Sequence, residues 1–107
     1  MTEEGKQELL RRVKELLQQA HGERLQGVIL YGSEARGEAT EDSDFDLMVL
    51  LRGPVELGDD LRTNVDALYE LEGEVLRSLH AMPVDIEAFN AQEYALYRNA
   101  KKEGIWL

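Results

Sequence analysis

The chain has 107 residues, with 22 Asp and Glu against 12 Lys and Arg and a formal net charge of −10. This length suits one domain, residues 1–107, and the hydrophobic share of 43% is ordinary for a folded globular protein. The acidic balance argues against binding DNA or RNA through clustered cations, and the lack of cysteine excludes disulfides, thiolate metal sites and a cysteine nucleophile. No segment resembles a signal peptide or a membrane span, so we expect a cytoplasmic protein.

The first half of the chain predicts a helix, a strand, a turn-rich connection and a second strand. Apolar residues recur at helical spacing over 4–21. An apolar, β-branched run over 28–31 lies between two glycines, which predicts a buried strand. Residues 32–43 are rich in turn formers, with room for one helical turn that begins at Ser33, and the apolar run over 45–51 predicts the second strand.

The second half predicts two helices and one strand. Asp59 or Asp60 can cap the first of these helices, and Pro83 stops it. The pattern predicts a helix over 61–79, a strand over 84–89, a helix over 90–102 and a short apolar tail over 105–107. The order of elements predicts an α/β or α+β domain with a small sheet packed by helices.

Acidic residues are concentrated in residues 38–60, where eight acids stand against one base, Arg52. Within this segment Asp44 and Asp46 flank Phe45 at the start of an apolar run. Side chains alternate along a strand, so both carboxylates face the same way, about 7 Å apart at Cβ. Because close carboxylates repel each other, the pair predicts a site for Mg²⁺, which prefers oxygen ligands and keeps waters or substrate phosphates. The alternative is an edge strand whose exposed face is merely acidic.

Upstream of this pair, Tyr31-Gly32-Ser33 opens the turn after the first strand. Glycine lets the backbone approach a ligand closely, and Ser33 offers both an N–H group and a hydroxyl to a phosphate. Arg36 adds a guanidinium that can clamp a phosphate or form a salt bridge within its own acidic loop. A Gly-Ser turn alone is weak evidence, but here a candidate phosphate-binding turn and a candidate metal-binding pair follow successive strands.

A third carboxylate, Asp85, lies on the strand predicted over 84–89. If that strand pairs beside the one carrying Asp44 and Asp46, the three carboxylates can face one cation and suit a two-metal phosphoryl-transfer site. Asp85 is then a general base or a ligand of the second metal. Glu87 shares its face and competes for this role, with a solvated strand-end charge as the alternative.

These residues carry a family resemblance. Gly32-Ser33, Arg36 followed by glycine, and Asp44-Phe45-Asp46, with ten residues between Ser33 and Asp44, resemble the minimal nucleotidyltransferases of the DNA polymerase β-like superfamily. The resemblance extends from residue 28 to the C-terminus. It implies a small mixed β-sheet packed by helices, the polymerase β-like nucleotidyltransferase fold.

The resemblance also implies an activity: Mg²⁺-dependent transfer of a nucleoside monophosphate, with ATP or another NTP as donor and AMP the expected group. Gly32, Ser33 and Arg36 would bind the triphosphate, and Asp44, Asp46 and Asp85 would hold two Mg²⁺ ions. Small members of the family are commonly encoded beside helical HEPN-domain proteins, and several such pairs resemble toxin–antitoxin systems. The expected acceptor is therefore a HEPN-type partner protein.

Two other functions remain open. One is a non-catalytic antitoxin or interaction module whose negative charge attracts a basic partner, and the other is a sensor that binds NTP without turnover. His21 and His80 are expected at helix C-termini, where imidazolium suits the helix dipole, and not as metal ligands. The three aromatic residues near the C-terminus either form an exposed patch for a partner or pack in the core: Tyr94, Tyr97 and Trp106.

Overall fold

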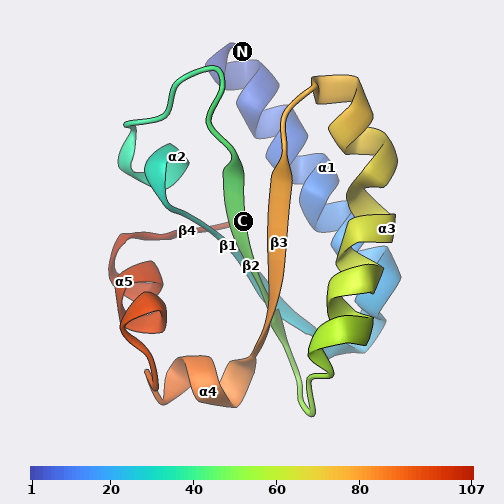
Figure 1. Ribbon diagram of the computed structural model, residues 1–107, viewed down its shortest axis with the longest axis vertical. Helices are drawn as coiled ribbons and strands as arrows, with labels where there is room; N and C mark the ends of the chain where they lie inside the picture. The colour runs from blue at the N-terminus through green and yellow to red at the C-terminus, as the bar shows by residue number, and fades with distance from the viewer.

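Helices and strands alternate through most of the chain (Figure 1). In the computed structural model, which describes residues 1–107, four strands form one sheet in the order β3-β2-β1-β4. β1 pairs antiparallel with both β2 and β4, whereas β2 and β3 are parallel. The elements are α1 (Glu3–His21), η1 (Gly22–Arg24), β1 (Leu25–Tyr31), α2 (Ser33–Arg36), β2 (Phe45–Leu51), α3 (Leu57–Val75), β3 (Leu79–Asp85), α4 (Ile86–Asn90), α5 (Ala95–Glu103) and β4 (Ile105–Trp106). This mixed sheet packed by helices confirms the predicted fold class.

The helices cover both faces of the sheet. Figure 1 shows α1 and α3 together on one side, with α4 and α5 on the other. Strand residues alternate between the two sides, since Val28 and Leu30 join the larger core beneath α1 and α3. Ile29 belongs instead to the smaller cluster with Phe89 and Ala100. The sheet is therefore the middle layer of three.

The central strand β2 is buried on both faces except at its start. Leu47 and Val49 face the larger core, while Met48 and Leu50 face the smaller cluster. Asp46 shares the parity of Met48 and Leu50, so its side chain lies on the face covered by α4 and α5. The alternation that packs the core thus also selects the side on which this carboxylate emerges.

Most predicted elements of the first half agree with the structure. The helix over 4–21 is α1, the strand over 45–51 is β2 with the same bounds, and the helical turn at Ser33 is α2. The apolar tail forms β4, which pairs with Ile29 and Leu30 of β1. None of the helices is both long and apolar enough to cross a membrane.

The predicted bounds of the helix over 61–79 and of the strand over 84–89, on either side of Pro83, are wrong. α3 ends at Val75, and Leu76 follows it as a left-handed C-cap with φ of 55°. β3 contains Pro83, which lies opposite Val49, whereas the residues after Asp85 form α4 instead of continuing the strand. Proline is tolerated because β3 has a neighbour on one side only, and the open side requires no donor.

Asp60 joins the start of α3 to the turn after α1. The helix begins after Glu56 as N-cap, so neither Asp59 nor Asp60 is the cap. The buried Asp60 carboxylate accepts two bonds from the Arg24 guanidinium, at 2.9 and 3.1 Å, and one from the Glu56 N–H at 3.0 Å. The bonds from Arg24 lower the pKa of the Asp60 carboxyl, and burial opposes this effect.

Asp60→Asn is expected to lower the free energy of unfolding by about 2 kcal/mol at neutral pH, because a buried charge-assisted pair is lost. Since the folded pKa is lowered, the wild-type contribution is complete above the ordinary Asp pKa and is lost as pH falls through the folded value. Denaturation between about pH 5 and pH 2 should show a shallower loss of stability in the variant. The exposed neighbour provides the control, and Asp59→Asn should change neither quantity.

Candidate functional site

The candidate site lies where β1 ends and β2 begins. Asp44 is exposed and Asp46 is half-buried, while Phe45 between them is fully buried in the larger core. Both carboxylates approach the same imidazole, that of His80, so the two point to the same side of the chain as predicted. Two oxygen donors with accessible faces fit the ligand preference of Mg²⁺.

Gly32 lies directly against this pair. The antiparallel register places Tyr31 opposite Asp46, so the turn that follows β1 starts beside the carboxylate. Gly32 has φ of 74°, and a Cβ atom there would stand 2.5 Å from Oδ2 of Asp46. The backbone therefore approaches the carboxylate more closely than any side chain would allow. Burial, and then the charge of Asp46, raise the pKa of Tyr31.

Ser33 and Arg36 are the first and last residues of the single turn α2. Ser33 is partly exposed, and the Gly32 carbonyl accepts the N–H of Arg36 at 3.2 Å, which closes the turn. Arg36 donates from Nε to the Glu38 carboxylate at 3.1 Å, the salt bridge that the sequence left as an alternative to a phosphate clamp. Its side chain is largely exposed.

A pocket of about 220 Å³ adjoins this turn. It lies between the end of β1 and α5, so it opens beside the glycine that touches Asp46. The pocket is lined by Tyr31, Gly32, Arg36, Leu96, Asn99, Ala100 and Glu103. The structure thus places a hollow beside the glycine that contacts the Asp46 carboxylate, while neither Asp44 nor Asp46 lines it.

Asp85 is not part of this site. β3 does pair beside β2, but the register places Asp85 opposite Leu51, at the far end of β2 from Asp46. Five residues of strand separate the two levels, about 16 Å. There Asp85 is the N-cap of α4, accepts the Glu87 N–H at 2.8 Å and touches Gly53. The prediction that Asp85 faces the same cation is wrong, and Glu87 lies at the same distant end.

His80 stands where the third carboxylate was expected. It lies opposite Asp46 in the parallel register, with Nδ1 3.8 Å from Asp46 and Nε2 3.7 Å from Asp44. Its prediction as a helix terminus was wrong, whereas His21 does end α1 and bonds to Asn64 Oδ1 at 2.6 Å. No group of three His, Cys, Asp or Glu side chains is already arranged to hold a metal.

A buried ion cluster holds the turn and the start of β2 together. Glu34, in α2, is buried and pairs with Lys6 of α1 at 3.3 Å and with Arg77. Arg77 also donates from Nε to the Ser43 carbonyl at 3.0 Å and lies 4.2 Å from the centre of the Phe45 ring. The cluster thereby links the residue after Ser33 to the residue before Asp44, so it positions both motifs. Sequence spacing did not indicate it, because Arg77 is distant in the chain.

Glu34→Gln is expected to lower the free energy of unfolding by about 3 kcal/mol, because two partly buried cations lose their common counter-charge. Chemical denaturation at neutral pH measures this change. Glu38→Gln is the matched control, since its pair with Arg36 is exposed and should contribute at most a few tenths of a kcal/mol. Equal losses in the two variants would contradict the role assigned to the buried cluster.

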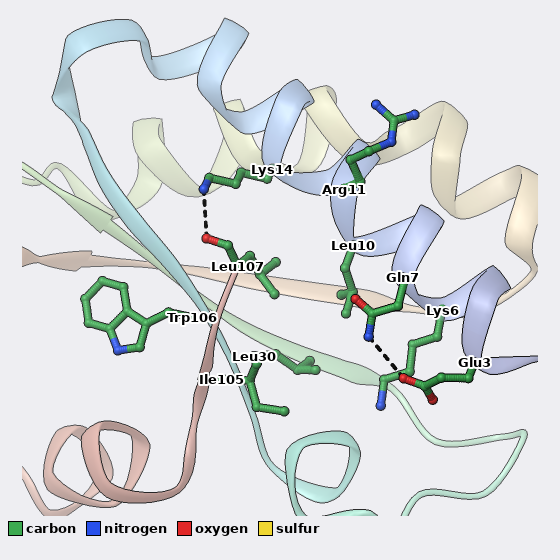
Figure 2. A pocket seen from close by; sticks show the side chains of 10 residues that line it. All are labelled: Glu3, Lys6, Gln7, Leu10, Arg11, Lys14, Leu30, Ile105, Trp106 and Leu107. Carbon is green, nitrogen blue, oxygen red and sulfur yellow. Dashed lines mark hydrogen bonds between the residues drawn. The ribbon is translucent and has the colours of Figure 1, made fainter.

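A second cavity, of about 360 Å³, lies between α1 and β4 (Figure 2). Its cations already have partners: Lys6 pairs with Glu34, Arg11 with two glutamates of α1, and Lys14 with the Leu107 carbonyl at 2.8 Å. An anion would have to compete with all of these. The cavity is therefore a weaker candidate than the site at Asp46.

The C-terminal aromatic residues combine the two predicted alternatives. Phe89 packs against Tyr97 and edge-on against Trp106, with ring centres 6.1 and 6.2 Å apart. Tyr94 and Trp106 are exposed, whereas Tyr97 is partly buried, which raises its pKa. The group is packed on its inner side and free on its outer side.

Known proteins resemble the chain in family and in fold. A family model described as the nucleotidyltransferase domain matches residues 7–107. No curated protein sequence matches the chain significantly. Two solved structures are toxin–antitoxin assemblies: one described as the toxin-antitoxin with AMP-PNP, and one as a mutant of the toxin-antitoxin MntA-HpeT.

The first has a TM-score of 0.65 at 17% identity over 90% of this chain and 69% of that one. The second has a TM-score of 0.60 at 13% identity over 92% and 70% of the two chains. A nucleotidyltransferase structure from Sulfolobus solfataricus gives 0.52 at 19% identity over 99% and 87%. At these identities the structures show a shared fold. The family model covers all but the first six residues and includes both motifs of the site, so the chain belongs to the nucleotidyltransferase domain family.

Proposed function

We propose that this chain transfers a nucleoside monophosphate, AMP from ATP in the first instance, to a partner protein and acts as the antitoxin of a HEPN-type toxin. The observation that carries the proposal is the contact between Gly32 and the Asp46 carboxylate, which brings the phosphate-binding turn onto the metal-binding pair. A triphosphate at the turn would lie within reach of an ion held by the pair. The neighbouring fold described with AMP-PNP supports an NTP donor.

Each residue of the proposed site has a separate task. Asp44 and Asp46 would hold Mg²⁺ through their carboxylate oxygens. Bound Mg²⁺ would neutralise phosphate charge and so ease attack at the α-phosphorus. Gly32 leaves room for the triphosphate, Ser33 offers its N–H and hydroxyl, and Arg36 exchanges its exposed pair with Glu38 for a phosphate.

The proposed reaction is a substitution at phosphorus. A hydroxyl oxygen of the partner, such as that of a tyrosine, forms a bond to the α-phosphorus of ATP. The bond between the α-phosphorus and the bridging oxygen breaks, pyrophosphate leaves with that oxygen, and the hydroxyl proton passes to solvent. Arrangement of the attacking and leaving oxygens in line is the main task of such a site.

ATP labelled at the α-phosphate tests the proposal. The chain is purified with a co-expressed HEPN-type partner, and label on the partner is measured with Mg²⁺ and after chelation with EDTA. We expect labelled partner and released pyrophosphate only when Mg²⁺ is present. Label that appears without a divalent cation would contradict the assigned site, and NTP binding with no pyrophosphate release would indicate a sensor instead.

A non-catalytic antitoxin is the second candidate. The net charge of −10, with eight acids in residues 38–60, favours rapid association with a basic partner. Neutralisation of the toxin that persists in Asp46→Asn, with no nucleotide transferred, would support binding over catalysis.

A further inference from the structure

α3 carries a second apolar row that the protein core does not use. Its inner face supplies Leu68 and Leu71 to the larger core. On its exposed side, here called the outer face, and at its C-cap, five large apolar residues are between 41% and 87% exposed: Leu57, Leu61, Val65 and Tyr69 of α3 and the cap residue Leu76. The first four follow at four-residue spacing, so they form one continuous row about 28 Å long as far as Leu76. Single exposed apolar residues are ordinary, but a row of five marks an interaction surface.

This row lies on an open side of the molecule. α1 contacts α3 on the opposite side, where Arg12 pairs with Glu74 at 2.7 Å, and Figure 1 shows α3 at the outer edge of the layer that it shares with α1. The C-terminal end of the row is hollowed. Tyr69, Gly73 and Leu76 line a depression of about 420 Å³ there, together with Glu70, Glu72, Arg77 and Ser78.

The edge strand β3, which lies near this row, is poorly suited to pair with an added strand. The Leu79 N–H already donates to the Glu72 carboxylate at 3.3 Å, and the Ala81 carbonyl accepts from Asn64 at 2.9 Å. Pro83 has no N–H to offer. Since edge strands covered in this way resist further pairing, the occupant of the neighbouring apolar row is a helix and not a strand.

The acidic residues of α3 favour a partner helix that carries basic residues. α3 contains six acids and one base, Arg62. The row directly beside the apolar one consists of Arg62, Asp66 and Glu70, and neither of its two acids has an ion pair within the chain. A second copy of α3 packed on the first would bring four unpaired acids together with only two arginines. A helix with lysines or arginines beside its apolar stripe would instead pair with them.

We propose that the outer face of α3 binds an amphipathic helix of a partner protein, one whose apolar stripe is flanked by basic residues. This inference rests on the proposed function, because it takes the bound protein to be the toxin that the chain modifies. It deepens that function by naming the surface to which the toxin would bind. The site at Asp46 remains free, since it lies on the face covered by α4 and α5, whereas α3 covers the other face.

Two synthetic helical peptides test the surface. Both have about 20 residues and the same leucines at four-residue spacing, one with lysines and one with glutamates beside them. Amide NMR of the labelled chain should show shifts at Leu61, Val65 and Tyr69 with the lysine peptide and none with the glutamate peptide. Equal binding of the two peptides, binding of neither, or shifts confined to other elements would overturn the proposal. Shifts at α3 that grow with protein concentration, without peptide, would also overturn it in favour of a second copy.

A matched pair of tyrosines completes the experiment. Tyr69→Ser should weaken binding of the lysine peptide about tenfold, because large apolar anchors dominate such interfaces. Tyr94→Ser removes a similarly exposed tyrosine from another surface and should leave binding unchanged. Asp46→Asn should bind the peptide like wild type. Peptide binding without nucleotide transfer would contradict the proposed function and support the binding surface on α3. Nucleotide transfer without peptide binding would support the proposed function and contradict the binding surface.

Discussion

Asp46→Asn is expected to lower the rate of nucleotide transfer to the partner by about a thousandfold, close to 4 kcal/mol of transition-state stabilisation. The amide keeps the size of the side chain but loses the negative charge that would bind Mg²⁺. Asp44→Asn should have a similar effect, because its carboxylate converges on the same point beside His80. Initial rates of label transfer at saturating MgATP measure the loss, and calorimetry with MgATP shows whether binding falls with it.

Asp85→Asn is the control, because the sequence motif places Asp85 in the site whereas the strand register places it outside. Asp85 lies opposite Leu51 at the far end of β2, so transfer by the folded variant should match that of wild type. Its cap on α4 is weakened, which should cost at most about 1 kcal/mol of stability, so rates are compared well below the unfolding temperature. A loss of transfer in Asp85→Asn as large as in Asp46→Asn would show that the third carboxylate acts at the site after all.

The central part of the site was predictable because it depends on local pattern. Alternation along one strand places Asp44 and Asp46 on one side, and a hairpin-like antiparallel pairing brings the turn after β1 to the start of β2. Both relationships involve residues close in sequence. The contact between Gly32 and Asp46 therefore follows once the two strands are recognised.

The position of Asp85 was not predictable in the same way, because the register between parallel strands is set far along the chain. Pro83 indicates a break in a helix as readily as an edge strand, and it made the strand begin five residues too late in the prediction. That shift hid His80, whose spacing of two from Met82 and four from Val84 is the strand signal that was available.

The buried ion cluster that positions the site could not be predicted from local sequence pattern either. Glu34 looks like one more acid in an acidic loop, yet it is buried by Lys6 and Arg77 from two distant segments. Only the folded chain brings Lys6 of α1 and Arg77, which lies between α3 and β3, to Glu34 in α2. The net charge of the chain therefore includes buried acids that are paired, such as Glu34, and exposed acids without an ion pair, such as Asp66 and Glu70 of α3.

Gly32→Ala is expected to lower nucleotide transfer about a hundredfold, because a methyl group would enter the space between the backbone and the Asp46 carboxylate. Its φ of 74° with ψ of −154° also lies in a region reserved for glycine, so the strain should cost about 1–3 kcal/mol of stability. Stability and transfer must therefore be measured on the same preparations.

Gly37→Ala separates the two effects. Its φ of 72° with ψ of 20° is a left-handed helical conformation, which alanine adopts at a smaller cost than the conformation of Gly32, and a Cβ atom there has no atom within 4 Å. It should therefore lose stability, about 1–2 kcal/mol, while the folded variant keeps its transfer rate and its affinity for MgATP. If the folded Gly32→Ala variant also keeps both, then the close approach to Asp46 is a packing feature and not the meeting point of phosphate and metal. If only the folded Gly32→Ala variant loses them, a positive φ by itself does not account for the loss, and the space beside the carboxylate is required for the reaction.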